Sequence, residues 1–239
     1  MKVFFLTSTF YPSIGGVEVG IHNISVRLSS MGNEIYVVCP WKARSIPNRS
    51  VLPYKILTLP PKFFFLTRYL KFFPVNIFYI VYYWILNYLY KPDFWHISMS
   101  YPAGLSFIGF ARIFRPNYLV RSVGVDIQIH RDSKYGFRLN KQVDNLFKRQ
   151  FRKIEYHVSA SECLIQEYCK LGVNKDKIFR IANGVDLKRF PKRVNSTIKL
   201  KSPLKLISVG RNDPKKNYKS LILAFSELQS LSDDNYQLT

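Results

Sequence analysis

Cysteine is scarce in this sequence, and histidine shows no metal-binding spacing. Cys39, Cys163 and Cys169 form no CxxC pair and are odd in number, a pattern that suits a reducing compartment. The four histidines are scattered, without an HExxH or similar arrangement of ligands. These absences predict a cytoplasmic protein that holds no metal ion and no other cofactor.

Acidic residues are also few, with 15 Asp and Glu against 36 Lys and Arg, which gives a net charge of +21 in 239 residues. Such an excess indicates an anionic partner: nucleic acid, an acidic membrane surface or a phosphorylated small molecule. The alternative is that the charge only keeps the protein in solution. RNP, KH, zinc-finger and helix-turn-helix signatures are missing, so no nucleic-acid partner is expected.

Long uninterrupted apolar runs are missing as well. The first apolar run ends at Leu6, which is too short for the hydrophobic region of a signal peptide. Residues 72–90 approach the length of a membrane span, but Pro74, Asn76 and Asn87 interrupt them and tyrosines crowd their second half. This composition favours a helix that is buried or lies on a membrane surface over one that crosses the bilayer.

What the sequence does contain is a regular alternation of strand-like and helix-like segments. Short apolar runs predict strands at residues 2–7, 34–39, 54–59, 93–98, 118–123, 156–160 and 178–182. Helical spacing of apolar residues predicts helices at 17–31, 62–90, 103–114, 143–154 and 162–171, the last capped by Ser161. Alternating strands and helices predict an α/β fold with a parallel, doubly wound sheet.

A change of amino-acid composition near residue 190 indicates a domain boundary. Residues 191–203 are polar and basic and are bracketed by prolines, so we interpret them as a linker between a first domain at 1–190 and a second at 204–239. The second segment restarts the pattern with one strand and one helix. A Rossmann-like domain needs on the order of 100 residues, so we expect this second domain to be incomplete and the chain to be truncated.

Two glycines lie between the first predicted strand and the first predicted helix. Gly15 and Gly16 would let a ligand approach the backbone closely, although their spacing is not that of the GxGxxG dinucleotide fingerprint. The alternative is a tight turn that requires a positive φ.

The turn in SVGRNDPKKNYKSLI, residues 208–222, is a second place where a phosphate could bind. Arg211, Lys215 and Lys216 precede a helix that Asn217 can cap. Free N–H groups at the start of a helix bind anions, and Arg and Lys add full positive charges. The alternative is that this is only a solvated basic turn.

Six stretches occur along the chain in the order FYPSIGGVE, KPDFWHIS, VGVDIQIHR, HVSASECLIQEYCKLGV, IANGVDLKRF and VGRNDPKKNYKSLILAF. Together they resemble family 4 of the retaining glycosyltransferases, which have the GT-B fold. The resemblance implies two Rossmann-like domains that face each other across a cleft. It also implies a nucleoside-diphosphate-sugar donor held mainly by the second domain, and a sugar, polysaccharide or lipid-linked acceptor held mainly by the first.

The resemblance also implies which residues bind the donor. Gly15 and Gly16 match positions against the donor diphosphate, where they leave room for the sugar. Arg211 and Lys216 match positions that neutralise the diphosphate, and cations there make it a better leaving group. Retaining members of this fold generally use no metal for that purpose.

The candidate catalytic residue is Asp126, in the VGVD stretch, which matches a family position on the first-domain side of the cleft. Two positions depart from the family. Val123 stands where the family commonly has a histidine that contacts the donor sugar, and the paired glutamates of the family would lie beyond Thr239.

The basic stretch 112–153 holds eleven Lys and Arg against three Asp, and it could rest on anionic lipid. The aromatic segment 62–90 could insert its rings at the same peripheral membrane surface, or it could pack into the core. An alternative to an active enzyme is a non-catalytic remnant, or one half of a split protein with a separate C-terminal half. Either would bind acceptor or membrane only.

Overall fold

The computed structural model describes residues 1–71, 73–190, 204–210, 212–231 and 236–239. The chain divides into two compact units, Met1–Asn183 (unit 1) and Gly184–Thr239 (unit 2), and each is described by itself. The predicted linker at 191–203 lies outside the described residues.

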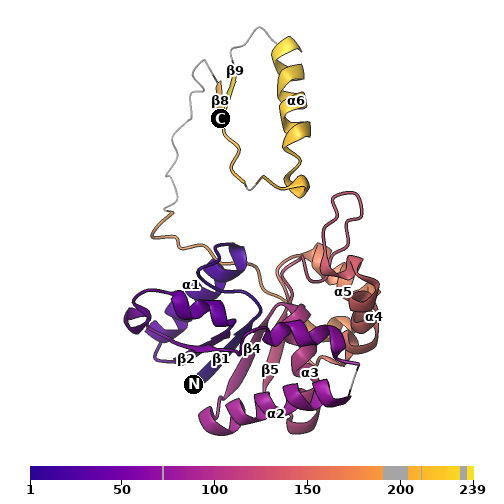
Figure 1. Cartoon of the computed structure of the whole chain (residues 1–239). Helices are drawn as coiled ribbons and strands as arrows, with labels where there is room; N and C mark the ends of the chain where they lie inside the picture. The colour runs from indigo at the N-terminus through magenta and orange to yellow at the C-terminus, as the bar shows by residue number, and fades with distance from the viewer. Residues whose placement is uncertain (72, 191–203, 211, 232–235) are drawn as a thin grey trace. The chain divides into compact units, whose positions relative to one another are not determined.

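Unit 1 is built on a seven-stranded parallel sheet in the order β3-β2-β1-β4-β5-β6-β7 (Figure 1). The strands are β1 (Lys2–Thr7), β2 (Glu34–Cys39), β3 (Lys55–Thr58), β4 (Phe94–Ser98), β5 (Tyr118–Arg121), β6 (His157–Ser159) and β7 (Ile178–Arg180). The strand order reverses at β1, which pairs with β2 on one side and β4 on the other. The predicted parallel, doubly wound α/β sheet is confirmed.

Helices cover both faces of this sheet. They are α1 (Gly16–Ser30), α2 (Phe73–Tyr90), α3 (Leu105–Phe114), α4 (Lys141–Gln150) and α5 (Glu162–Lys170). Successive residues of a strand point to opposite faces: Phe5 of β1 packs with Ile21 of α1, whereas Phe4 belongs to the cluster that holds Tyr83 of α2 and Phe107 of α3.

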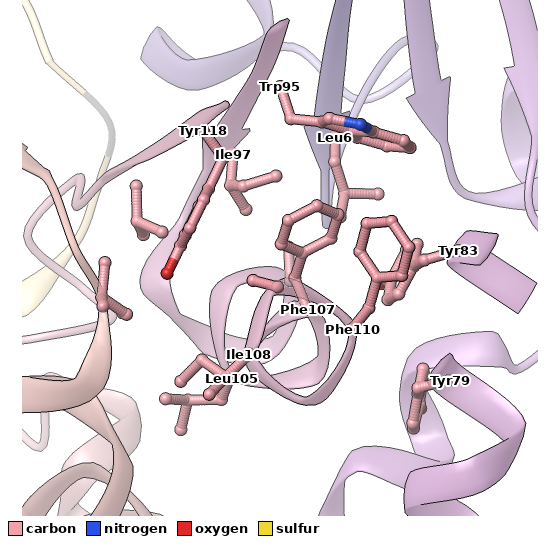
Figure 2. Packing of buried hydrophobic residues seen from close by; sticks show 14 of the residues in the cluster. Leu6, Tyr79, Tyr83, Trp95, Ile97, Leu105, Phe107, Ile108, Phe110 and Tyr118 are labelled. Carbon is pink, nitrogen blue, oxygen red and sulfur yellow. The ribbon is translucent and has the colours of Figure 1, made fainter. Parts of the chain in front are cut away.

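The larger of the two cores is aromatic. Tyr83, Trp95, Phe107 and Phe110 gather between α2, α3 and β4 (Figure 2). The ring of Phe107 lies with its centroid 5.0 Å from those of both Tyr83 and Trp95, and all of these side chains are fully buried. Rings packed edge to face or tilted at this spacing add to the stabilisation from burial alone.

The predicted helix at 62–90 is wrong in its first part. The chain instead forms a 3₁₀ helix at Phe63–Tyr69, and α2 begins at Phe73. Pro74 gives the reason, because proline lacks the N–H that a helix interior needs but fits the first turn of a new helix. Residue 72 lies outside the described residues.

The other helix boundaries also shift. Helix α3 begins two residues later than predicted, after an irregular turn at Ser100–Gly104, and α4 ends at Gln150, before a 3₁₀ turn. Ser161 does hold the N-cap position of α5, but its side chain makes no capping hydrogen bond. The hydroxyl of Ser159 instead binds the backbone of Ser161.

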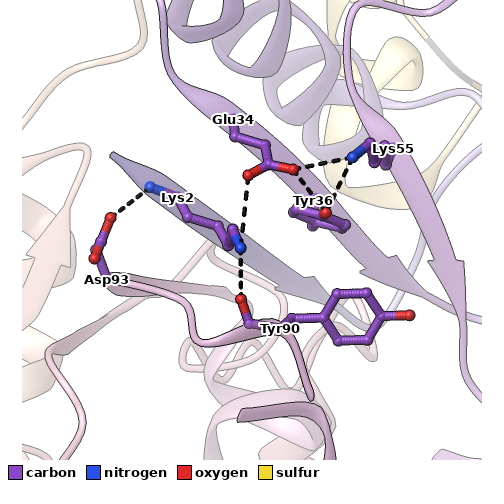
Figure 3. A network of polar contacts seen from close by, with 6 residues as sticks. All are labelled: Lys2, Glu34, Tyr36, Lys55, Tyr90 and Asp93. Atoms are coloured by element: carbon purple, nitrogen blue, oxygen red, sulfur yellow. Dashed lines mark hydrogen bonds and ion pairs between the residues drawn. The ribbon is translucent and has the colours of Figure 1, made fainter. Parts of the chain in front are cut away.

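Polar side chains tie together the amino ends of the central strands (Figure 3). Lys2 donates from its backbone N–H to Asp93 at 2.6 Å, and its ammonium lies 3.6 Å from a carboxylate oxygen of Glu34. Glu34 also accepts from Lys55 at 2.9 Å and from the hydroxyl of Tyr36 at 2.8 Å. The hydrogen bond from Lys55, followed by that from Tyr36, lowers the pKa of Glu34 to about 2.

Unit 2 contains β8 (Leu204–Leu206), a 3₁₀ turn at Pro214–Lys216, α6 (Tyr218–Leu231) and β9 (Tyr236–Leu238). The two strands pair in parallel, as expected for a β–α–β unit whose crossover is a helix.

Candidate functional site at the carboxyl edge of the sheet

In open α/β sheets, ligands bind beyond the carboxyl ends of the strands, where the strand order reverses. Here the reversal falls between β1 and β4. The loops that follow β1, β4 and β5 therefore define the candidate site of unit 1.

Hydrogen bonds join these three loops into one rim. The N–H of Ala103, after β4, donates to the hydroxyl of Ser8, after β1, at 3.1 Å. The buried hydroxyls of Ser100 and Ser122 bond to each other and so link the loops after β4 and β5. The rim is held by polar groups of the chain itself, which leaves it preorganised for a ligand.

Asp126 is fully buried beneath this rim. Its carboxylate accepts backbone N–H groups from Val123 at 3.0 Å and Gly124 at 3.1 Å, and a third from Ser100 across the rim. Burial raises its pKa to about 6, although the three N–H donors act in the opposite direction. Gly124 has a φ of +105°, which favours glycine at this bend.

These bonds place Asp126 as the residue that fixes the loops after β4 and β5. The catalytic role expected for it from the resemblance stays a prediction. Val123, which stands at the usual histidine position, is half-buried in the same loop.

Gly15 and Gly16 open helix α1, and neither has a positive φ. The tight-turn explanation is therefore excluded. A Cβ on Gly16 would meet nothing within 4 Å, so the space beside it is open. A Cβ on Gly15 would lie 2.8 Å from Oε2 of Glu18, so a side chain at position 15 would displace the end of the Glu18 side chain.

Glu18 is a buried acid at this site that the sequence reasoning did not single out. It lies in the first turn of α1 and accepts a hydrogen bond from the hydroxyl of Thr9. An acid three residues after the N-cap is favourable next to the free N–H groups of a helix start. That spacing was the signal in the sequence that could have identified it.

Aromatic and imidazole groups continue the site on the α1 side. Burial, followed by the charge of Glu18, raises the pKa of Tyr11. The ring of Tyr11 packs edge-on against His22, and Nδ1 of His22 lies 2.8 Å from the hydroxyl of Tyr54. Burial lowers the pKa of His22, so the ring favours its neutral form.

Arg121 adds a positive charge at the carboxyl end of β5. Its guanidinium donates to the side chain of Asn183 at 2.7 Å and to the carbonyl of Ile181 at 3.3 Å. The start of the IANGVD stretch is therefore fixed to the edge of the sheet. Burial lowers the pKa of Arg121.

The structure describes only part of the predicted donor site in unit 2. Arg211 lies outside the described residues. Lys216 ends the 3₁₀ turn just before α6 and is exposed. Asn217 precedes the helix with a φ of +52°, and its side-chain oxygen accepts a hydrogen bond from the hydroxyl of Ser220.

A doubly wound parallel sheet with a polar rim at its carboxyl edge is the architecture of a GT-B glycosyltransferase domain. The profile of glycosyltransferase family 4 matches residues 14–189, well over half of the 239 residues. The chain therefore belongs to glycosyltransferase family 4. Comparison with curated protein sequences finds no match.

Solved structures share the fold at low sequence identity. A glycosyltransferase from Rickettsia africae is 16% identical with a TM-score of 0.66, over 99% of this chain and 59% of its own. HepE of Anabaena, solved in complex with UDP, is 16% identical with a TM-score of 0.61, over 95% and 58%. Sucrose-phosphate synthase of Thermosynechococcus elongatus is 12% identical with a TM-score of 0.66, over 100% and 61%. The chain thus spans about three fifths of the length of each.

Proposed function

We propose that this chain takes part in the transfer of a sugar from a nucleoside-diphosphate sugar to an acceptor, with retention at the anomeric carbon. The family match over residues 14–189 carries the proposal, because it includes the start of α1 and the rim loops after β4 and β5. The UDP and UDP-glucose complexes of HepE support a nucleotide sugar as the donor.

In this proposal the donor lies against the start of α1, where the open space beside Gly16 leaves room for it. Arg211 and Lys216 neutralise the diphosphate as it leaves, and opposite charge at a developing anion lowers the barrier. Asp126 holds the rim in shape through the three backbone N–H groups that it accepts.

The acceptor that we propose is a sugar chain or a lipid-linked sugar, bound on the side of Tyr11, His22 and Tyr54. We place the reaction in the cytoplasm, at the inner face of the cell membrane. The three cysteines support a reducing compartment, because none of them is in a disulfide.

The direct test is donor binding and diphosphate release with UDP-, GDP- and ADP-linked hexoses, followed by determination of the product anomer. Gly16→Val fills the open space at the helix start and should weaken donor binding at least tenfold. Gly20→Val is the matched control, because its Cβ also meets nothing within 4 Å, one turn further along α1. Equal affinities for the two variants would contradict the placement of the donor.

A second test concerns the diphosphate. Lys216→Ala should lower donor affinity about tenfold, because a charge-assisted hydrogen bond contributes about 1.5–3 kcal/mol. Lys219→Ala removes a nearby exposed charge from α6 and serves as the control. If both variants lose the same small amount of donor affinity, and added salt abolishes the difference in affinity from wild type, the turn is only a solvated basic loop.

A second candidate function is binding without transfer. Two observations favour it: Val123 replaces the usual histidine, and the carboxylate of Asp126 is occupied by backbone N–H groups. Acceptor binding without diphosphate release from any donor would favour this candidate over the enzyme.

A further inference from the structure

Helix α2 turns its apolar residues outward. Its fully buried side chains are Tyr79, Tyr83 and Leu86. Every exposed residue of the helix is apolar or aromatic, and these are Phe73, Pro74, Ile77, Phe78, Val81, Trp84, Ile85, Tyr88 and Leu89. We call this set the α2 ridge.

The two asparagines of α2 face the interior instead. Asn76 donates from its side chain to the carbonyl of Leu70. Asn87 accepts a hydrogen bond from the indole N–H of Trp95 at 3.1 Å. The side-chain amides of both asparagines thus have partners within the protein, and the exposed residues of the helix carry no polar group other than the indole N–H of Trp84 and the hydroxyl of Tyr88.

The ridge is long for an exposed apolar surface. Helix α2 has 18 residues, which at 1.5 Å per residue is about 27 Å. Ile113 and Phe114, at the end of the neighbouring helix α3, are also exposed apolar residues. Single exposed apolar residues are ordinary, whereas a continuous face of this length marks an interaction site.

Basic side chains line two hollows, one next to the start of α2 in the chain and one at the end of α3. No Asp or Glu occurs between Lys62 and Pro92. Arg68, Lys71 and Arg149 line a hollow of about 120 Å³, and the first two lie just before α2 in the chain. Arg112, Arg115 and Lys153 line a larger hollow of about 610 Å³ at the end of α3, together with the single acid Glu155.

We propose that the α2 ridge and these two basic hollows dock unit 1 on a membrane that contains anionic phospholipid. The ridge lies in the plane of the interface with its side chains about 5–10 Å into the headgroup and acyl boundary. The hollows receive lipid phosphates, which Arg binds in bidentate fashion. Trp84, Tyr88 and Tyr82 are of the residue types that concentrate at this depth.

The net charge of the chain distinguishes a membrane from the other possible partners of the α2 ridge. A second copy of the chain would bring another net charge of +21 against the same surface, which opposes association. Nucleic acid would match the charge but not the apolar ridge. Among the described residues no helix is long and apolar enough to cross a bilayer, so the ridge lies on the membrane rather than through it.

The first test is co-sedimentation of the full chain with vesicles. Binding is expected to 3:1 phosphatidylcholine:phosphatidylglycerol vesicles in 0.1 M salt, and much less to phosphatidylcholine alone. Each Lys or Arg near an acidic surface contributes about a factor of five in partitioning. Arg112→Gln with Arg115→Gln should therefore weaken binding at least tenfold, whereas Arg27→Gln with Lys42→Gln, at a distance from α2 in the chain, should weaken it less.

The ridge itself is tested by Trp84→Ser with Leu89→Ser, which should weaken binding at least tenfold while circular dichroism stays unchanged. Val51→Ser, at an exposed apolar residue outside α2, is the matched control. Equal binding by the ridge variant and its control would overturn the proposal.

Insertion has its own spectroscopic readout. In a Trp41→Phe background, brominated acyl chains should quench Trp84, and Trp95 in the core stays unquenched as an internal reference. Vesicle binding without quenching would overturn docking through the ridge. A second outcome would also overturn it: the wild-type chain binds no vesicles and forms a stable dimer in sedimentation velocity, and the ridge variant abolishes that dimer. These readouts need no donor, so they are independent of sugar transfer.

Discussion

Folded proteins usually bury apolar groups and expose polar ones. The rim at the carboxyl edge of the sheet and the outer face of α2 depart from this rule in opposite directions. The rim buries polar groups, among them Ser100, Ser122 and Asp126, and each has a hydrogen-bond partner within the chain. The α2 ridge exposes apolar groups: Phe73, Tyr88 and Leu89 are each more than 60% exposed. Buried polar groups are thus explained inside unit 1, whereas exposed apolar groups point to a partner outside it.

The largest difference in unfolding free energy is expected between substitutions at two adjacent residues of α2. Tyr83 is 0% exposed and its hydroxyl bonds to Ser106, whereas Trp84 is 43% exposed. Tyr83→Ala should cost about 3–5 kcal/mol of unfolding free energy, and Trp84→Ala less than about 1 kcal/mol. Urea denaturation of both variants measures the difference. Equal losses would mean that Trp84 is covered in solution, and the comparison between the two faces of α2 would fail.

Removing the carboxylate of Asp126 from the rim is expected to lower the unfolding free energy by a somewhat smaller amount. Asp126→Ala leaves backbone N–H groups of Ser100, Val123 and Gly124 without their acceptor. Each unsatisfied buried donor costs about 1–3 kcal/mol, offset in part by loss of a buried charge, so a net cost of about 3 kcal/mol is expected. Thermal unfolding measures it, with Asp132→Ala in an exposed loop as control. A loss below 1 kcal/mol would show that the rim does not rely on this carboxylate.

His157 extends the comparison because it is a buried polar group whose packing partners are mainly the rings of Phe151 and Tyr168. Neither ring nitrogen makes a hydrogen bond of normal geometry to the described residues. Burial, followed by the charge of Lys177, lowers its pKa to about 4. The folded state therefore binds fewer protons here than the unfolded state between pH 4 and about 6.5, and stability falls as the pH falls through that window.

His157→Phe removes this titration and fits between the rings of Phe151 and Tyr168. The advantage of the variant over wild type should grow by about 1.6 kcal/mol from pH 6.5 to pH 5, because the full slope of about 1.36 kcal/mol per pH unit is reached only below the unfolded-state pKa. Urea midpoints of both proteins across this range measure it. Parallel pH profiles would show that His157 reaches water in the folded state.

The smallest effect is expected at Asn87, which gives the indole N–H of Trp95 its acceptor. Asn87→Leu should cost about 1 kcal/mol, the net value of one such hydrogen bond, and should leave vesicle binding unchanged because Asn87 faces inward. Asn23→Leu, at an exposed residue of α1, is a control for the same change elsewhere. A gain in vesicle affinity would mean that Asn87 belongs to the outer face.

The sheet could be predicted because its strands are short apolar runs separated by helical patterns, and those patterns are local. The orientation of α2 could not be predicted, since a helix that is apolar all round carries no periodic signal for which side faces the core. In the sequence, Asn76 and Asn87 stand as interruptions of an apolar run. In the structure both make side-chain hydrogen bonds within unit 1, and the inward side is formed by Tyr79, Tyr83 and Leu86.

The candidate site was predictable only in its outline. The pair Gly15 and Gly16 is visible in the sequence, but the open space beside Gly16 is known only from the folded structure. Asp126 was identified through the family resemblance, and its burial depends on loops from two strands that meet only in the folded sheet.

The central place of β1 has a consequence for biosynthesis. This strand is made first, yet it pairs with β4, and the bond from Lys2 to Asp93 joins positions 91 residues apart. Until β4 leaves the ribosome, β1 and β2 form a ribbon whose apolar strand has one unpaired edge, a state prone to misassembly. Such distant pairing is slow, so that edge stays open to misassembly while the residues between β2 and β4 are synthesised.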